Sequence, residues 1–115
     1  MPFLFFGGIG AMNISSSYCG GKLTVYFGGE LDHHEAGGAI KTMNELIEDY
    51  MPRECVIDMS SLGFMDSSGI AVVINALRKM RATGGRLSVA NPTEQARRVL
   101  QASGVERLLE TAVSI

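Results

Sequence analysis

The chain has 115 residues, 46% of them hydrophobic and 19% charged, which is the composition of a single globular domain and not of a disordered segment. Its formal net charge of −2 argues against a dedicated nucleic-acid binder, because such a protein needs a basic surface to displace phosphate counterions. No polybasic amphipathic segment is present in the sequence to hold the chain on an anionic membrane. Cys19 and Cys55 fall in no CxxC or zinc-binding spacing, so we expect two free thiols in a reducing cytoplasm.

Residues 1–11 combine a short apolar cluster with several glycines. The cluster is too short to span a bilayer, and it lacks the basic start of a secretory signal. Because the patterned sequence begins just after Met12, we expect residues 1–11 to be a disordered extension and residues 12–115 to form one domain.

The first half of this domain predicts a hairpin followed by a helix. Residues 13–18 are a weak strand candidate, whereas residues 22–27 alternate apolar and polar side chains as a half-buried strand does. The glycines between them signal a turn, which predicts an antiparallel hairpin. Residues 32–51 then carry apolar side chains at helical spacing, and the Gly37-Gly38 pair within them suggests the close approach of a neighbouring element.

The second half alternates strands and helices. Residues 55–59 are apolar on both faces and predict an interior strand covered by helices on both sides. A largely buried helix is expected over 70–81, a strand over 86–90, and a further helix over 91–103 with Asn91 as its N-cap. After it we expect a helical turn and a last edge strand. The order predicts an α/β fold with a mostly parallel central sheet, an antiparallel N-terminal edge strand and flanking helices.

A short polar motif, Asp66-Ser67-Ser68-Gly69, stands at the predicted start of the helix over 70–81. Asp66 is the natural N-cap, accepting from the backbone N–H of Ser68 or Gly69. Ser67 then lies exposed at the carboxyl edge of the sheet, where ligands bind in such folds, and the helix start would tolerate a phosphate on its hydroxyl. The alternative is that the motif only caps the helix.

Asp32 also follows a predicted strand and precedes a helix, so it shares the edge with Ser67 if the two strands are neighbours. Either His33 or His34, together with an acid, could complete a hydrolase triad with Ser67, but the G-x-S-x-G motif of that class is absent. Adjacent helical residues do not point together, so the two histidines do not predict a metal site. We therefore expect no enzyme, no cofactor and no metal.

Two segments carry a family resemblance. GELDHHEA (29–36) and DMSSLGFMDSSGIAVV (58–73) resemble the signature segments of the bacterial anti-sigma-factor antagonists, the STAS domain family. Residues 84–109 also follow the family pattern, so the resemblance covers roughly 12–115. Within the family it is greatest to the sporulation branch, which antagonises the anti-sigma-F factor.

This resemblance implies a regulatory protein and not an enzyme. In its unphosphorylated form the protein would bind an anti-sigma factor that is also a serine kinase, and so release the sigma factor. The kinase would phosphorylate Ser67, and a PP2C-type serine phosphatase would restore it. Asp32, Asp66, Ser68 and Gly69 would surround the phosphoacceptor and contact the partner. The protein would be cytoplasmic and a monomer when free, with no nucleic acid or membrane as a partner.

Two further alternatives remain. The same fold could be the STAS regulatory module of a general stress-response pathway or of another signalling pathway. It could also bind a small ligand, such as a nucleotide or a lipid, at the edge that carries Ser67. No phosphate-binding loop of the G-x-x-x-x-G-K type supports this second alternative.

Overall fold

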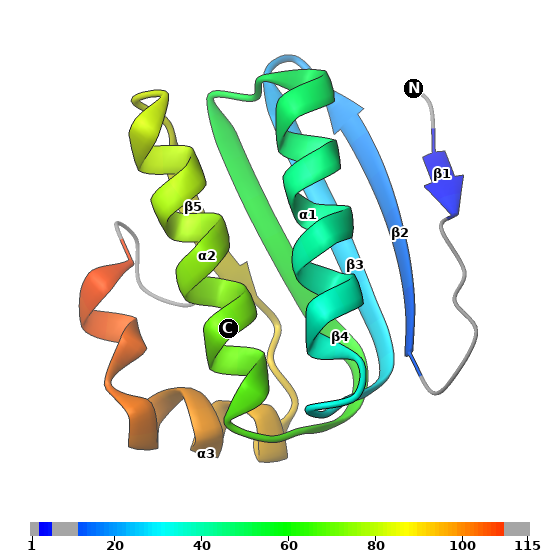
Figure 1. The fold of residues 1–115 in the computed structure, drawn as a ribbon, viewed down its shortest axis with the longest axis vertical. Coiled ribbons are helices and arrows are strands. Elements are labelled where there is room, and N and C mark those ends of the chain that lie inside the picture. Colours follow the sequence, from blue (N-terminus) through cyan, green and yellow to red (C-terminus); the bar gives the residue numbers. More distant parts are fainter. Residues whose placement is uncertain (1–2, 6–11, 110–115) are drawn as a thin grey trace.

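The computed structural model describes residues 3–5 and 12–109. From β2 to α3 the elements follow the predicted order, which confirms the α/β class (Figure 1). The elements are β1 (Phe3–Phe5), β2 (Met12–Cys19), β3 (Lys22–Leu31), α1 (Ala36–Tyr50), β4 (Glu54–Met65), α2 (Ser68–Ala82), β5 (Arg86–Ala90), α3 (Glu94–Ser103) and the 3-10 turn η1 (Val105–Leu108).

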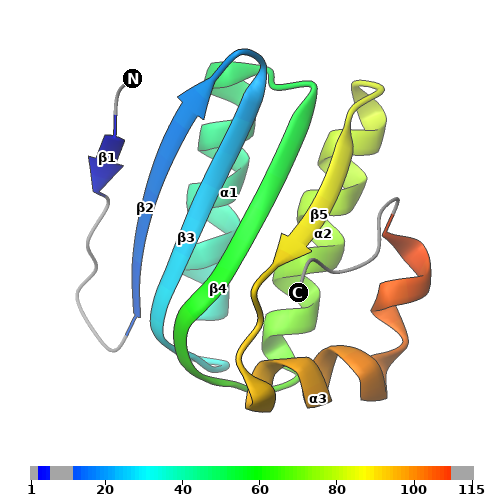
Figure 2. The ribbon, with the colours of Figure 1, turned by 180° about the vertical axis from the view of Figure 1, so that it is seen from behind.

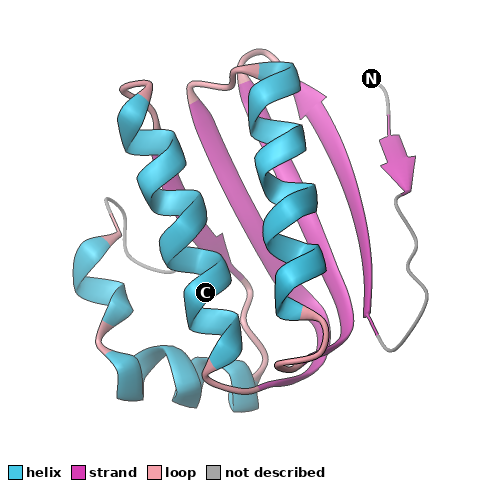
Figure 3. Ribbon diagram, viewed as in Figure 1, coloured by secondary structure: helices cyan, strands magenta, loops and turns pink. Residues whose placement is uncertain are grey.

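The strands form one mixed sheet in the order β1-β2-β3-β4-β5 (Figure 3). The pairs β1–β2 and β2–β3 are antiparallel, and the pairs β3–β4 and β4–β5 are parallel. The predicted hairpin is confirmed, with a turn at Gly20 (φ 58°) and Gly21 (φ 85°), the left-handed conformations that two-residue hairpin turns require.

Part of the expected extension forms the outer edge of this sheet. Phe3–Phe5 pair with Ser15–Ser17 as strand β1. Residues 1–2 and 6–11 lie outside the described residues, so the extent of an extension stays a prediction.

The two long helices, α1 and α2, lie side by side on the same face of the sheet (Figures 1 and 2). The prediction that residues 55–59 are covered by helices on both sides is therefore wrong. The reason is topological: the strand order advances in one direction from β3 to β5, and parallel crossovers share one hand, so both put their helix on the same face. Cys55, Ile57 and Met59 face these helices and are fully buried, while Asp58 on the opposite face is only half-buried.

The core fills the space between the sheet and the two helices. Its strand residues alternate along β3, β5 and the first half of β4, and its helix residues recur at helical spacing on α1 and α2. Fully buried members with large side chains include Leu23, Phe27, Met43, Ile47, Ile57, Met80 and Leu87.

Two local predictions fail. Gly37 and Gly38 are exposed, and a Cβ at either position would meet no other atom within 4 Å, so no neighbouring element approaches them. Asn91 is not the N-cap of α3, because Thr93 takes that position and its hydroxyl accepts from the N–H of Ala96 at 3.3 Å. Asn91 has a left-handed φ of 53° in the preceding loop and donates to the Asp58 carboxylate at 3.0 Å.

Both cysteines are free, as expected from the sequence. Burial raises the pKa of the Cys55 thiol to about 12, whereas Cys19 is exposed at the end of β2.

Among the described helices, none combines the length and the apolar character needed to cross a bilayer.

Candidate functional site

The carboxyl ends of β3 and β4 meet at one edge of the sheet. Leu31 and Met65 are register partners, and the N–H of Asp66 donates to the carbonyl of Leu31 at 3.2 Å. Asp32 and Asp66, the next residues on each strand, therefore stand at the same edge. This confirms the prediction that Asp32 and Ser67 share it.

The Asp66 carboxylate caps the start of α2. Its Oδ1 accepts from the N–H of Ser68 at 2.8 Å, and its carbonyl accepts from the N–H of Gly69 at 3.0 Å. The predicted hydrogen bond from the Ser68 N–H to Asp66 is thereby confirmed, but the N-cap residue of α2 is Ser67 and not Asp66, which lies one residue further from the helix. Because this bond uses the backbone of Ser68, the Ser68 hydroxyl is not needed for it.

Ser67 lies immediately before the first residue of α2 and already has helical dihedral angles (φ −63°, ψ −18°). Its side chain is exposed, and among the described residues none forms a hydrogen bond with its hydroxyl. The hydroxyl is thus accessible, while the backbone that carries it is held by the bonds on either side. A reactive group placed in this way can be modified without breaking a side-chain interaction.

Asp32 caps a turn rather than the helix itself. Its Oδ1 accepts from the N–H groups of His34 at 2.9 Å and Glu35 at 3.2 Å, and α1 begins only at Ala36. The predicted helix start at residue 32 is thus too early by one turn. The carboxylate is half-buried and orders the connection that borders Ser67.

The histidines are placed by this turn. The rings of His33 and His34 lie 3.9 Å apart, so the expectation that they point apart is wrong. The reason is that they belong to the turn before α1, where helical spacing does not apply. Within residues 3–5 and 12–109, no group of three or more His, Cys, Asp or Glu side chains could hold a metal ion. In the same residues neither imidazole is hydrogen-bonded to Ser67, so this geometry lends no support to the hydrolase alternative.

Gly69 is needed for packing. A Cβ at this position would lie 2.5 Å from Cγ of Met65 and 3.1 Å from Cδ2 of Leu31. The glycine therefore lets the first turn of α2 lie directly against the ends of β3 and β4. Its contribution to the site is indirect, through the position of the helix that carries Ser67.

Gln95 is a member of this site that sequence reasoning missed. From α3 its Oε1 accepts from the N–H of Met65, and its Nε2 donates to the carbonyl of Met65, both at 2.8 Å. A polar residue on an amphipathic helix is typical of the solvent face, so no pattern in the sequence identified it. Its two bonds fasten α3 to the strand end that leads into Ser67.

A second contact fixes the loop before α3. Burial of Asp58 opposes its ionisation, but hydrogen bonds from Ser60 and Asn91 outweigh this and lower the pKa of the carboxyl. The Asp58–Asn91 bond ties the end of β5 to β4. Helix α3 is therefore attached to β4 at two points, through Asn91 and through Gln95.

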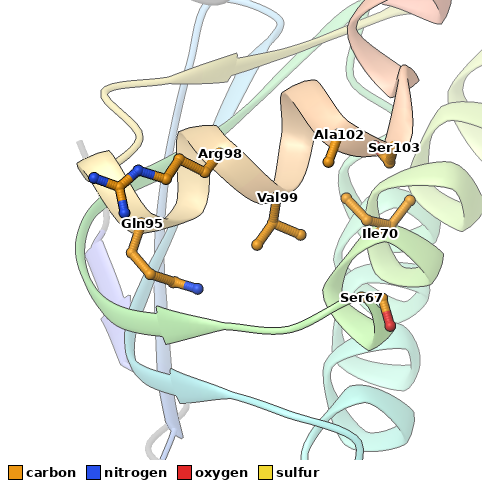
Figure 4. Close-up of a pocket in the computed structure, with 7 residues that line it drawn as sticks. All are labelled: Ser67, Ile70, Gln95, Arg98, Val99, Ala102 and Ser103. Carbon is orange, nitrogen blue, oxygen red and sulfur yellow. The ribbon is translucent and has the colours of Figure 1, made fainter.

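An open groove of about 490 Å³ runs between the start of α2 and α3. In Figure 4, Val99 and Ala102 on α3 lie across the groove from Ile70 and Ser67. Its lining is mostly apolar, and Ser67 is part of it. It is lined by Ser67, Ile70, Gln95, Arg98, Val99, Ala102 and Ser103.

Comparison with known proteins agrees with this arrangement. The STAS domain family matches residues 15–115. The chain belongs to the STAS domain family. It is 30% identical over 98 residues to an anti-sigma F factor antagonist of Paenibacillus polymyxa, covering 85% of this chain and 84% of the relative.

Two solved structures extend the comparison of this STAS domain. The anti-sigma factor antagonist SpoIIAA in its unphosphorylated form superimposes with a TM-score of 0.74 at 25% identity, covering 89% of this chain and 88% of the other. The Bacillus cell fate determinant SpoIIAA in the phosphorylated form superimposes with a TM-score of 0.66 at 25% identity, covering 89% and 91%. The fold is thus similar to structures of both phosphorylation states.

Proposed function

We propose that this STAS domain is an anti-sigma factor antagonist controlled by phosphorylation of Ser67. Its unphosphorylated form binds an anti-sigma factor that is a serine kinase and so releases the sigma factor. The kinase then transfers a phosphoryl group to Ser67, and a PP2C-type phosphatase removes it. The observation that carries the proposal is the exposed hydroxyl of Ser67, held without a side-chain partner among the described residues on the fixed start of α2.

The charge of a phosphate explains why modification would switch binding off. A phosphoserine adds about two negative charges at neutral pH. At Ser67 they would join the carboxylates of Asp66 and Asp32 on one edge of the sheet. The positive end of the α2 dipole offsets part of this repulsion, so the domain can carry the phosphate and remain folded. The partner, by contrast, would have to desolvate the added charge.

The surface around Ser67 has the character of a binding site for a protein. Phe64, three residues before Ser67, is 41% exposed, and Ser67 itself lines the mostly apolar groove. Exposed aromatic and apolar groups inside a polar rim are typical of the energetically important part of an interface. Ser67, Gln95, Arg98 and Ser103 supply the polar groups of the groove lining, and Asp32 and Asp66 stand at the adjoining edge of the sheet, while Gly69 acts through packing.

A small-ligand module is the second candidate, because the groove volume falls within the range of about 300–1,000 Å³ found for ligand pockets. A STAS module of a stress-response or other signalling pathway would use the same edge with another partner. The name of the Paenibacillus polymyxa relative favours an anti-sigma F factor as the partner. In this proposal the protein acts in the cytoplasm and is a monomer when free.

The proposal is tested by complex formation. The purified chain is mixed with the anti-sigma kinase from the same genome, bound to its sigma factor, and the complexes are separated by size-exclusion chromatography. Without hydrolysable ATP, we expect the chain to elute with the kinase and the sigma factor to elute alone. If the sigma factor stays bound at every chain concentration, the antagonist function is wrong. Groove filling by a small ligand with no kinase binding would favour the second candidate.

A further inference from the structure

The side chain of Gln95 forms hydrogen bonds with both polar groups of the Met65 backbone, its N–H and its carbonyl. The carboxamide of Gln95 accepts from the Met65 N–H and donates to the Met65 carbonyl, each at 2.8 Å. Among side chains in their ordinary protonation state at neutral pH, only asparagine and glutamine carry an acceptor and a donor side by side in this way. The pairing has the pattern of a strand hydrogen-bonded to its neighbour.

The sheet topology explains why a side chain takes the place of a neighbouring strand at Met65. Strand β5 pairs with β4 only from Glu54 to Asp58, whereas β4 continues to Met65. At Met65 the side facing β3 is used by the next residue, since Asp66 donates to Leu31. The N–H and carbonyl of Met65 point to the other side, where β5 has already ended. Gln95 supplies the missing partner, so the backbone is satisfied where the sheet stops.

We propose that Gln95 is the positioning residue of the phosphoacceptor. Met65 is two residues before Ser67, and Gln95 on one side and Leu31 on the other hold the backbone that leads into it. The same bonds set the distance between α3 and the start of α2, and so the width of the groove beside Ser67. This inference rests on the proposed function for its biological meaning, but the positioning itself is a property of the free chain.

The variant Gln95→Glu separates positioning from simple packing. A protonated carboxyl keeps one acceptor and one donor, so it can repeat both bonds to Met65. An ionised carboxyl has acceptors only, and one of them faces the Met65 carbonyl. The bond to the carbonyl favours the protonated form, so the pKa of the introduced carboxyl should lie above its usual value of about 4.3. In Gln95→Glu the hydrogen bond to the Met65 carbonyl is therefore lost at high pH and is restored as pH falls.

The matched control is Gln101→Glu. Gln101 is on the same helix and exposed, and among the described residues its side chain has no hydrogen-bond partner. Its substitution adds the same charge to α3 without touching Met65. Any pH-dependent change that the wild type and Gln101→Glu also show is subtracted from the change in Gln95→Glu.

The test is nuclear magnetic resonance of the full, uncomplexed chain between about pH 4 and 8. For Gln95→Glu we expect the amide signals of Asp66, Ser67 and Ser68 to be displaced at pH 8 and to return to wild-type positions near pH 4. For Gln101→Glu they should follow the wild type throughout. Signals of Gln95→Glu that coincide with the wild type at pH 8, or stay displaced at pH 4, would overturn the proposal.

A second variant covers the case in which the charge prevents folding. Gln95→Met has a similar length and no polar group, so the Met65 N–H loses its acceptor and its amide hydrogen should exchange at least tenfold faster. Unchanged exchange at Met65 would contradict the assignment.

The functional consequence is measured with the anti-sigma kinase and ATP at pH 8. We expect the rate of Ser67 phosphorylation to fall roughly five- to tenfold in Gln95→Glu, the range that the loss of one hydrogen bond produces, and to be unchanged in Gln101→Glu. Equal rates in wild type and Gln95→Glu would refute the role of Gln95. If the wild type itself is not phosphorylated, the proposed function fails while the magnetic resonance result still decides the positioning.

Discussion

Leu31 and Met65 are register partners at the ends of the two central parallel strands, β3 and β4. Their pairing brings the turn capped by Asp32 next to the helix start capped by Asp66. The site is thus assembled by the sheet, and each carboxylate orders the backbone on its own side. Ser67 is the exposed residue that this arrangement presents at the start of α2.

The two serines of the motif should be separable by mutation. Ser67→Ala should bind the anti-sigma factor as well as wild type but accept no phosphate, and Ser67→Asp should bind at least tenfold more weakly because of its charge. Ser68→Ala should still be phosphorylated, since Asp66 bonds to the Ser68 backbone and not to its hydroxyl. Calorimetric titration and intact mass measure both properties. Equal binding by Ser67→Asp and Ser67→Ala would argue against a charge-based switch.

The cap formed by Asp66 should contribute measurably to stability. Asp66→Ala removes the acceptor for the Ser68 N–H and should lower the free energy of unfolding by about 1 kcal/mol. Asp66→Asn keeps an acceptor and should recover most of this loss. Asp49→Ala, at an exposed position near the end of α1, is the control and should change stability by less than about 0.5 kcal/mol. Urea unfolding gives the values, and an equal loss in Asp66→Ala and Asp66→Asn would show that the cap is not the cause.

Two glycines should respond to alanine in opposite directions. Gly69→Ala forces a methyl group to within 2.5 Å of Met65 and should destabilise the domain by about 1–3 kcal/mol. Gly37→Ala, with open space around it at the start of α1, should be neutral or stabilise by about 0.5 kcal/mol. Thermal unfolding of the two variants provides the comparison. A Gly69→Ala protein as stable as Gly37→Ala would mean that α2 does not pack as closely on β4 as described.

Asp58 should make part of the stability dependent on pH. Its pKa in the folded state is lowered, so its contribution is complete above the unfolded value of about 3.9 and is lost as pH falls through the folded value. Asp58→Asn has no charge to titrate and should lose less stability than the wild type between pH 5 and 2, a window set by that reference value of about 3.9. Parallel pH curves for the two proteins would contradict this. The same variant also reports on the Asn91 contact that attaches the loop before α3.

Much of this site was predictable because local chemistry determines it. The Asp66 cap needs only a helix start and a carboxylate, and the shared edge needs only two neighbouring parallel strands. Gln95 was not predictable, since its two bonds depend on where β5 ends relative to β4. The strand order, which a sequence pattern does not contain, also decides that α1 and α2 share one face.

The wrongly predicted helix starts also depend on structure that the sequence pattern does not contain. Asn91 and Asp32 each looked like the first residue of a helix, but tertiary bonds or an intervening turn moved the helix starts to Glu94 and Ala36. Helical spacing does not apply to His33 and His34, because they lie in the turn before α1.

We propose Ser67 as the phosphoacceptor of a kinase-controlled antagonist. Its most direct test is the intact mass of the chain after incubation with the anti-sigma kinase and ATP, followed by peptide mapping. We expect the addition of one phosphate, located on Ser67, and none in Ser67→Ala. Phosphate on another residue, or equal labelling of wild type and Ser67→Ala, would contradict it.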